Sequence, residues 1–194
     1  MADIGINDYL ESRYAQYAVF VTESLKEKLA AYLRIAQDEF EIDGKLAADQ
    51  FVYGDRVVLF LVSGKELKVT LKIHYSPSDV ESLVPQKLKE AAASKDFAIS
   101  SYFSELGNLI AGSLKASFLD MGYVVGISLP INASCYDEMI SSDKLVQNRA
   151  YSYFAIKIKT GAVFYITLNV DNDGEGLKKY VYEKKAEEED SDFL

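Results

Sequence analysis

Apolar side chains recur at steps of three and four between residues 8 and 39, which is the spacing of one face of a helix. From about residue 50 the spacing changes to two. An apolar run at 57–62 and an alternating run at 67–73 flank Ser63-Gly64, and this pattern predicts a β-hairpin. A charged connection punctuated by Pro77 and Pro85 follows, with a short helix expected at 86–93.

The second half of the chain repeats this order. A helix is expected at 101–121, a strand at 123–129, a loop of about twenty residues, and a second hairpin with strands 152–158 and 162–170 around Thr160-Gly161. We interpret the repetition as a degenerate internal duplication, although two such hairpins can also arise by chance in an α+β chain. The duplication predicts an α+β fold with pseudo-duplicated helix-plus-hairpin halves, in which two long helices pack on one continuous, mainly antiparallel sheet.

Length and composition favour one domain. The chain has 194 residues, of which 49% are hydrophobic, enough for a substantial core. We expect a single domain over residues 1–185 and a disordered acidic tail over 186–194. No apolar run is long enough to span a membrane, and the N-terminus is acidic where a secretory signal is basic, so a cytoplasmic location is expected.

Charge and residue counts narrow the chemistry. The net charge is −9 and no Lys/Arg cluster interrupts the acidic excess, so nucleic acid is not an expected partner. His74 is the only histidine and Cys135 the only cysteine. The chain therefore has too few such side chains for a structural zinc site, and a Cys/His or Ser/His/Asp catalytic arrangement is not expected. The run 171–175 looks like a calcium loop but lacks the ligand spacing, so we expect no metal site and interpret it as a turn ending the last strand. Catalysis would have to use carboxylates, amides or hydroxyls.

On a helical wheel, segment 101–121 separates into two faces. The broad apolar face, expected to pack on the sheet and interrupted only by Ser117, contains Phe103, Leu106, Ile110, Leu114, Phe118 and Met121. The narrow, mainly polar stripe on the other side is broken late by Leu119 and contains Ser101, Glu105, Asn108, Gly112 and Lys115. Gly107 points towards the core.

Two residues distinguish this stripe from an ordinary solvated face, which is the alternative interpretation. Asn108 and Gly112 are poor helix formers, and the glycine alone costs about 1 kcal/mol of helix stability. Gly112 also removes side-chain bulk one turn after Asn108. The backbone of another macromolecule could therefore approach this surface closely.

The same segment resembles the signature of the CheC/CheX/FliY group of chemotaxis phosphatases. The resemblance is strongest from about residue 97 to 130 and rests on Ser101, Glu105 and Asn108 at that spacing, the run Leu109-Ile110-Ala111-Gly112, Gly122, and Ile127-Ser128-Leu129-Pro130. The 21 residues between Asn108 and Pro130 are near the usual spacing of this group.

The resemblance implies a function. In this family the signature helix docks on a CheY-like response regulator and accelerates hydrolysis of its aspartyl phosphate, with Mg²⁺ carried by the regulator. Carried over, Asn108 would orient the attacking water and Glu105 would pair with the regulator's active-site lysine, while Ser101, Gly112 and Lys115 would contact the partner. The resemblance also implies a possible homodimer formed by joining sheets.

A count tests whether the first half carries a second site. Counting back from the two hairpin glycines places the counterparts of Glu105 and Asn108 near Asp8 and Glu11, where no Glu/Asn pair stands. We therefore expect a CheX-like protein with one site.

The segment after Pro130 lacks a glycine expected in CheX-like sequences. The alternatives are a non-catalytic CheX-like module that binds a receiver domain or flagellar-switch component or dimerises, and, from the fourteen tyrosines, a small-ligand-binding domain.

Overall fold

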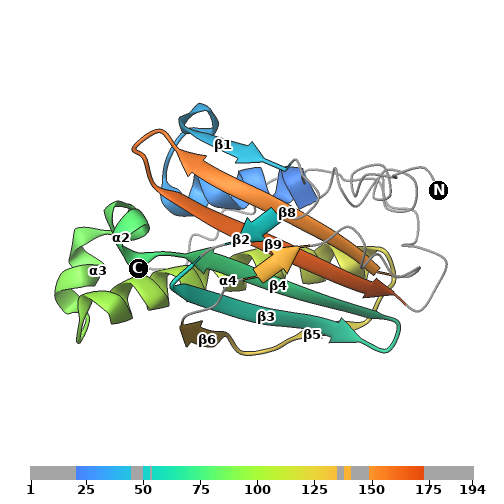
Figure 1. Ribbon diagram of the computed structural model, residues 1–194. Helices are drawn as coiled ribbons and strands as arrows, with labels where there is room; N and C mark the ends of the chain where they lie inside the picture. Colours follow the sequence, from blue (N-terminus) through green and yellow to red (C-terminus); the bar gives the residue numbers. More distant parts are fainter. Residues whose placement is uncertain (1–20, 45–49, 53, 135–137, 141–148, 173–194) are drawn as a thin grey trace, which may run out of the picture.

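The computed structural model describes residues 21–44, 50–52, 54–134, 138–140 and 149–172 (Figure 1). Residues 21–33 are helical. The helical elements that follow are η1 (Gln37–Glu39), α2 (Pro77–Val80), η2 (Glu81–Leu83), α3 (Gln86–Ala91) and α4 (Lys95–Asp120). The strands are β1 (Phe40–Asp43), β2 (Gln50–Val52), β3 (Arg56–Gly64), β4 (Leu67–Tyr75), β5 (Val125–Ile127), β6 (Ile131–Ser134), β7 (Glu138–Ile140), β8 (Arg149–Ile158) and β9 (Val163–Asn172).

Seven strands form one antiparallel sheet. Its order is β1-β8-β9-β4-β3-β5, with β6 also paired to β3, and β2 and β7 form a separate two-stranded ladder. The helix at 21–33 and α4 lie on the same side of the sheet (Figure 1). The predicted α+β class, with helices on a continuous antiparallel sheet, is confirmed.

The strand register relates the two hairpins by pseudo-two-fold symmetry, as an internal duplication would. Gly161 follows Gly64 by 97 positions, and Leu168 follows Leu71 by the same number. Leu71 and Leu168 are paired across the central β4–β9 ladder, so this pair lies at the centre of a pseudo-two-fold arrangement of the two hairpins. The flanking strands obey the same relation, because β1 of the first half pairs with β8 of the second, and β5 of the second half pairs with β3 of the first.

The two long helices end in the same way. Arg34 and Gly122 both follow a helix and have positive φ, 55° and 84°. The Ile35 amide donates to the Ala30 carbonyl at 3.2 Å, which closes the first helix in a Schellman-type turn. This helix therefore ends at residue 33 and not at 39 as predicted, because the backbone reverses at Arg34 although apolar periodicity continues beyond it. The predicted stretch 8–20 lies outside the described residues.

Helix α4 begins six residues earlier than predicted. Ser94 is its N-cap, and the Ser94 hydroxyl accepts from the Phe97 amide at 3.1 Å. The first turns add Ala98 and Ile99 to the core, both almost fully buried. Ser101, where the helix was expected to begin, lies inside it.

The edge of the sheet beside α4 differs most from the prediction. The expected strand 123–129 is reduced to β5, and the expected long loop contains β6 and β7. β5 pairs with β3 through Val62↔Ile127, whereas β6 pairs through Leu59↔Ile131. Three residues, 128–130, thus face two on β3, which is a β-bulge.

The apolar face of α4 packs on the sheet as predicted. All of its predicted members are buried, and so is Ser117. Phe103 stacks on Tyr75 with a centroid distance of 4.3 Å and meets Phe164 edge-on at 5.3 Å. Gly107 also faces the core, because a Cβ there would lie within 3.0 Å of Phe60 Cδ2 and closer still to Cε2.

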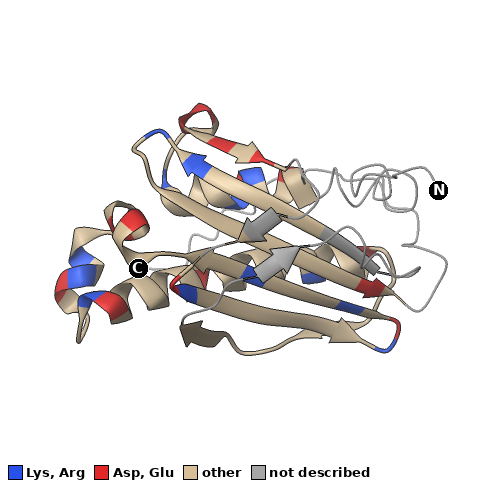
Figure 2. Ribbon diagram, viewed as in Figure 1, with Lys and Arg blue, Asp and Glu red and all other residues tan. Residues whose placement is uncertain are grey.

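β9 continues through Asp171 and Asn172, so the last strand does not end at 170, while 173–175 and the tail at 186–194 lie outside the described residues. His74 is fully buried on β4 with its Nε2 at 3.4 Å from Thr167 Oγ1. No helix in the described part of the chain is long and apolar enough to cross a membrane. Acidic and basic side chains are interspersed along the described ribbon (Figure 2).

Candidate functional site

The polar stripe of α4 faces outward at Glu105 and Asn108, which are both exposed. They are three positions apart, so their side chains leave neighbouring turns on one side of the helix. Ser101, one turn earlier than Glu105, is half-buried. Gly112 and Lys115 are also half-buried and lie further along the helix, and open space surrounds the position of a Cβ at Gly112.

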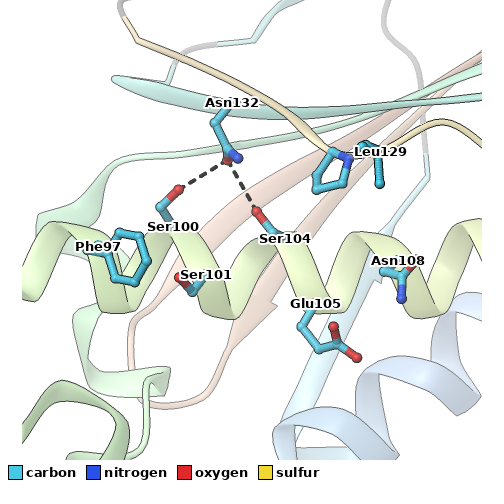
Figure 3. Close-up of a pocket in the computed structure, with 9 residues that line it drawn as sticks. Phe97, Ser100, Ser101, Ser104, Glu105, Asn108, Leu129 and Asn132 are labelled. Carbon is cyan, nitrogen blue, oxygen red and sulfur yellow. Dashed lines mark hydrogen bonds between the residues drawn. The ribbon is translucent and has the colours of Figure 1, made fainter. Parts of the chain in front are cut away.

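An open cavity of about 420 Å³ runs along this side of α4 (Figure 3). Of the five predicted stripe residues, it brings together Ser101, Glu105 and Asn108. Gly112 and Lys115 do not line it. The complete lining consists of Phe97, Ser100, Ser101, Ser104, Glu105, Asn108, Leu129, Pro130 and Asn132.

The β-bulge builds one wall of the cavity. Within it, Ser128 takes over the pairing of Leu61: its amide donates to the Leu61 carbonyl at 2.8 Å, and its hydroxyl accepts from the Leu61 amide at 3.0 Å. The same hydroxyl donates to the Leu129 carbonyl at 2.9 Å. Pro130 has no amide hydrogen to pair, which suits an edge position at a bulge. The chain therefore turns outward here, and Leu129 is 85% exposed at the cavity.

A polar cluster between β6 and α4 also lines the cavity. The hydroxyls of Ser100 and Ser104 donate to Oδ1 of Asn132 at 3.1 and 3.3 Å (Figure 3). These three residues, which we call the Asn132 cluster, join β6 to α4 and were not predicted. One sequence feature could have pointed to this cluster. Asparagine is a poor strand former, and Asn132 follows Pro130, a residue typical of sheet edges, by two positions.

Glu105 stands beside a pair of tyrosines that connects the two long helices. Tyr32 donates its hydroxyl to the Tyr102 carbonyl at 2.9 Å, and the two rings lie 4.7 Å apart. Burial, the neighbouring Tyr102 and the negative charge of Glu105 all raise the pKa of Tyr32. Burial raises the pKa of Tyr102 to about 12. The contact fixes α4 against the first helix one turn before Glu105.

These tyrosines predict a loss of stability at high pH. Burial also raises the pKa of Tyr153 to about 12, with smaller contributions from Tyr165 and Asp43. An unfolded tyrosine ionises near pH 10, so above that pH the unfolded chain loses protons that the folded chain keeps. We expect the free energy of unfolding to be constant just below pH 10 and to fall between pH 10 and 12. Urea unfolding across this range measures the free energy of unfolding, and absorbance at 295 nm follows the tyrosinate. Tyr102→Phe should reduce the fall of this free energy with pH, and an equal fall in that variant would contradict the assignment.

The site offers hydroxyl, amide and carboxylate groups. Among the described residues, no three His, Cys, Asp or Glu side chains gather closely enough to hold a metal ion. Chemically, the stripe can accept a cation at Glu105, and it can donate and accept hydrogen bonds at Asn108.

A seven-stranded antiparallel sheet with two helices on one side is the fold that this chain shares with solved structures of CheC-like and CheX chemotaxis proteins. No family model and no curated protein matches the chain, but solved structures do. A CheC-like superfamily protein from Shewanella sp. PV-4 matches with a TM-score of 0.60 and 19% identity, covering 81% of this chain and 98% of that one.

Two CheX structures match comparably well. CheX in the CheX–CheY–BeF₃–Mg²⁺ complex of Borrelia burgdorferi has a TM-score of 0.61 and 12% identity, covering 80% of this chain and 98% of that one. CheX of Desulfovibrio desulfuricans has a TM-score of 0.56 and 12% identity, covering 79% and 98%. At these identities the comparison shows a shared fold.

Proposed function

We propose that this chain is a CheX-like phosphatase that hydrolyses the aspartyl phosphate of a CheY-like receiver domain. Asn108 orients the attacking water, and Glu105 pairs with the receiver's active-site lysine. The observation that carries the proposal is the placement of Glu105 and Asn108, exposed on adjacent turns of α4 and beside an open cavity, in a chain that has the CheX fold.

Hydrolysis of an aspartyl phosphate needs few catalytic groups from this chain. An acyl phosphate is already reactive, and most of the catalysis consists of holding a water in line with the phosphorus beside the Mg²⁺ that the receiver carries. An amide can accept a hydrogen bond from that water while it donates another. Glu105 supplies the charge that complements a lysine, and the interface excludes bulk water from both groups.

The proposal predicts that Asn108→Ala removes the acceleration of dephosphorylation. Receiver domains from the host are phosphorylated, and phosphate release is followed with Mg²⁺ present and with this protein added. We expect the wild-type protein to accelerate release from at least one receiver, and Asn108→Ala to lower kcat at least about tenfold, because the water loses its orienting group.

Two variants on α3 provide matched controls. Gln86→Ala removes an exposed amide, and Glu90→Ala an exposed carboxylate, from a hydrogen-bonded pair outside the cavity. Both should retain the wild-type rate. If no host receiver is dephosphorylated faster, the phosphatase proposal is wrong; binding of a receiver without acceleration would establish the non-catalytic module instead.

A further inference from the structure

Two rows of side chains on α4 meet at Asn108. One row contains Ser101 and Glu105, and Asn108 follows Glu105 by three positions. The other row contains Ser100 and Ser104, and Asn108 follows Ser104 by four positions. The second row holds Asn132, through the hydrogen bonds of 3.1 and 3.3 Å to its Oδ1 (Figure 3). The proposed catalytic row therefore has a second polar row beside it that leads to β6.

The register of the sheet places Asn132 on the helix side. Asn132 pairs with Val58, which is fully buried on the face of β3 that α4 covers. Paired residues share a face of the sheet, and successive residues alternate. Because β6 lies at the edge of the sheet, Asn132 reaches the flank of α4 and stays exposed.

The bonding of Asn132 fixes which of its groups faces a partner. A side-chain amide offers two lone pairs on oxygen and two hydrogens on nitrogen. The two serine hydroxyls occupy the oxygen, so the amide is oriented and only its Nδ2 hydrogens are left to meet a ligand in the cavity. The Asn132 cluster is thus an oriented hydrogen-bond donor.

We propose that Asn132 is a specificity-determining residue that donates from Nδ2 to a carbonyl or carboxylate oxygen of the CheY-like receiver docked on Glu105 and Asn108. The inference rests on the proposed function. One cavity contains Asn108 and Asn132, so a partner that fills it meets both. Ser104, which holds Asn132, is one helical turn, about 6 Å, from Asn108, so Asn132 contacts a part of the receiver away from the reacting atoms.

Exposed apolar side chains support a macromolecular partner at this position. Phe97 is 60% exposed and Leu129 85% exposed, and both line the cavity with the Asn132 cluster. A docked protein would remove both from water. Neighbours that exclude water increase the contribution of a hydrogen bond to the binding free energy of an interface.

The test separates the donor, Nδ2 of Asn132, from the acceptor oxygen that holds Asn132 against Ser100 and Ser104. Asn132→Asp keeps an acceptor for Ser100 and Ser104 but removes the Nδ2 donor. Affinity is measured by titrating the panel of receivers, activated with beryllium fluoride and Mg²⁺, and turnover is measured separately. We expect Asn132→Asp to raise Kd and KM about three- to tenfold, as for one lost hydrogen bond, with kcat unchanged.

Ala133→Asp is the matched control, because it adds the same charge at the next, outward-facing position of β6. It should bind as the wild type does. Equal affinities for Asn132→Asp and wild type, or equal losses in Asn132→Asp and Ala133→Asp, would overturn the inference. If a receiver binds but is not dephosphorylated faster, the proposed function fails while this comparison still decides the role of Asn132. If no receiver binds, both fail.

Discussion

Replacing Glu105 with lysine should weaken binding to the activated receiver at least about thirtyfold. Under the proposed function Glu105 meets the receiver's active-site lysine, and the variant places two cations together in an interface that excludes water. Disrupting a buried charge pair costs about 2–5 kcal/mol of binding free energy, and 2 kcal/mol corresponds to about thirtyfold in Kd. Titration of the receiver by calorimetry measures the change.

Glu90→Lys makes the same change of charge on the exposed surface of α3. It should bind at least as tightly as the wild type, because it lowers the acidic excess of the chain. A receiver whose lysine is replaced by glutamate should regain affinity for Glu105→Lys. Equal weakening by Glu90→Lys and Glu105→Lys would show that net charge, and not this pair, controls the interaction.

The orientation of the α4 stripe could be predicted because helix periodicity is local. The step of 3.6 residues per turn places Phe103 inward and Glu105 outward whatever the rest of the chain does. The beginning of α4 was mispredicted because Ser94 and Ser101 are both good caps, and only packing of the early turn, with Ala98 and Ile99 buried, favours Ser94.

The cavity wall could not be predicted in the same way. The bulge exists because the Ser128 hydroxyl replaces a backbone partner of Leu61, and the sequence alone does not reveal which strand will be its neighbour. The Asn132 cluster depends on that bulge, because the shift in register puts Asn132 opposite Val58. Sequence reasoning therefore found the residues that share a helix and missed those that a sheet edge brings to it.

The matching helix ends correct the count between the two halves. Gly122 follows Arg34 by 88 positions, so the counterparts of Glu105 and Asn108 in the sequence are Tyr17 and Phe20, and not residues near Asp8 and Glu11. The count from the hairpin glycines was displaced because the connection from helix to hairpin is longer in the second half. Neither Tyr17 nor Phe20 can replace a carboxylate or an amide, which agrees with one Glu/Asn site per chain.

Valine at Gly107 should destabilise the protein by about 3 kcal/mol, whereas valine at Gly112 should change stability by less than about 0.5 kcal/mol. Gly107 packs against the fully buried ring of Phe60, which a Cβ would displace. At Gly112 no atom lies within 4 Å of a Cβ, and valine is a better helix former than glycine. Urea unfolding followed by circular dichroism measures both changes.

The two valine variants also separate an effect on stability from an effect on receiver binding. If Gly112 leaves room for the backbone of the receiver, Gly112→Val should lower receiver affinity in a protein that is as stable as the wild type. Gly107→Val should lose activity only in proportion to the unfolded fraction, because its side chain faces the sheet. Wild-type affinity in Gly112→Val would remove Gly112 from the proposed contact surface and confine that surface to the cavity between Phe97 and Asn108.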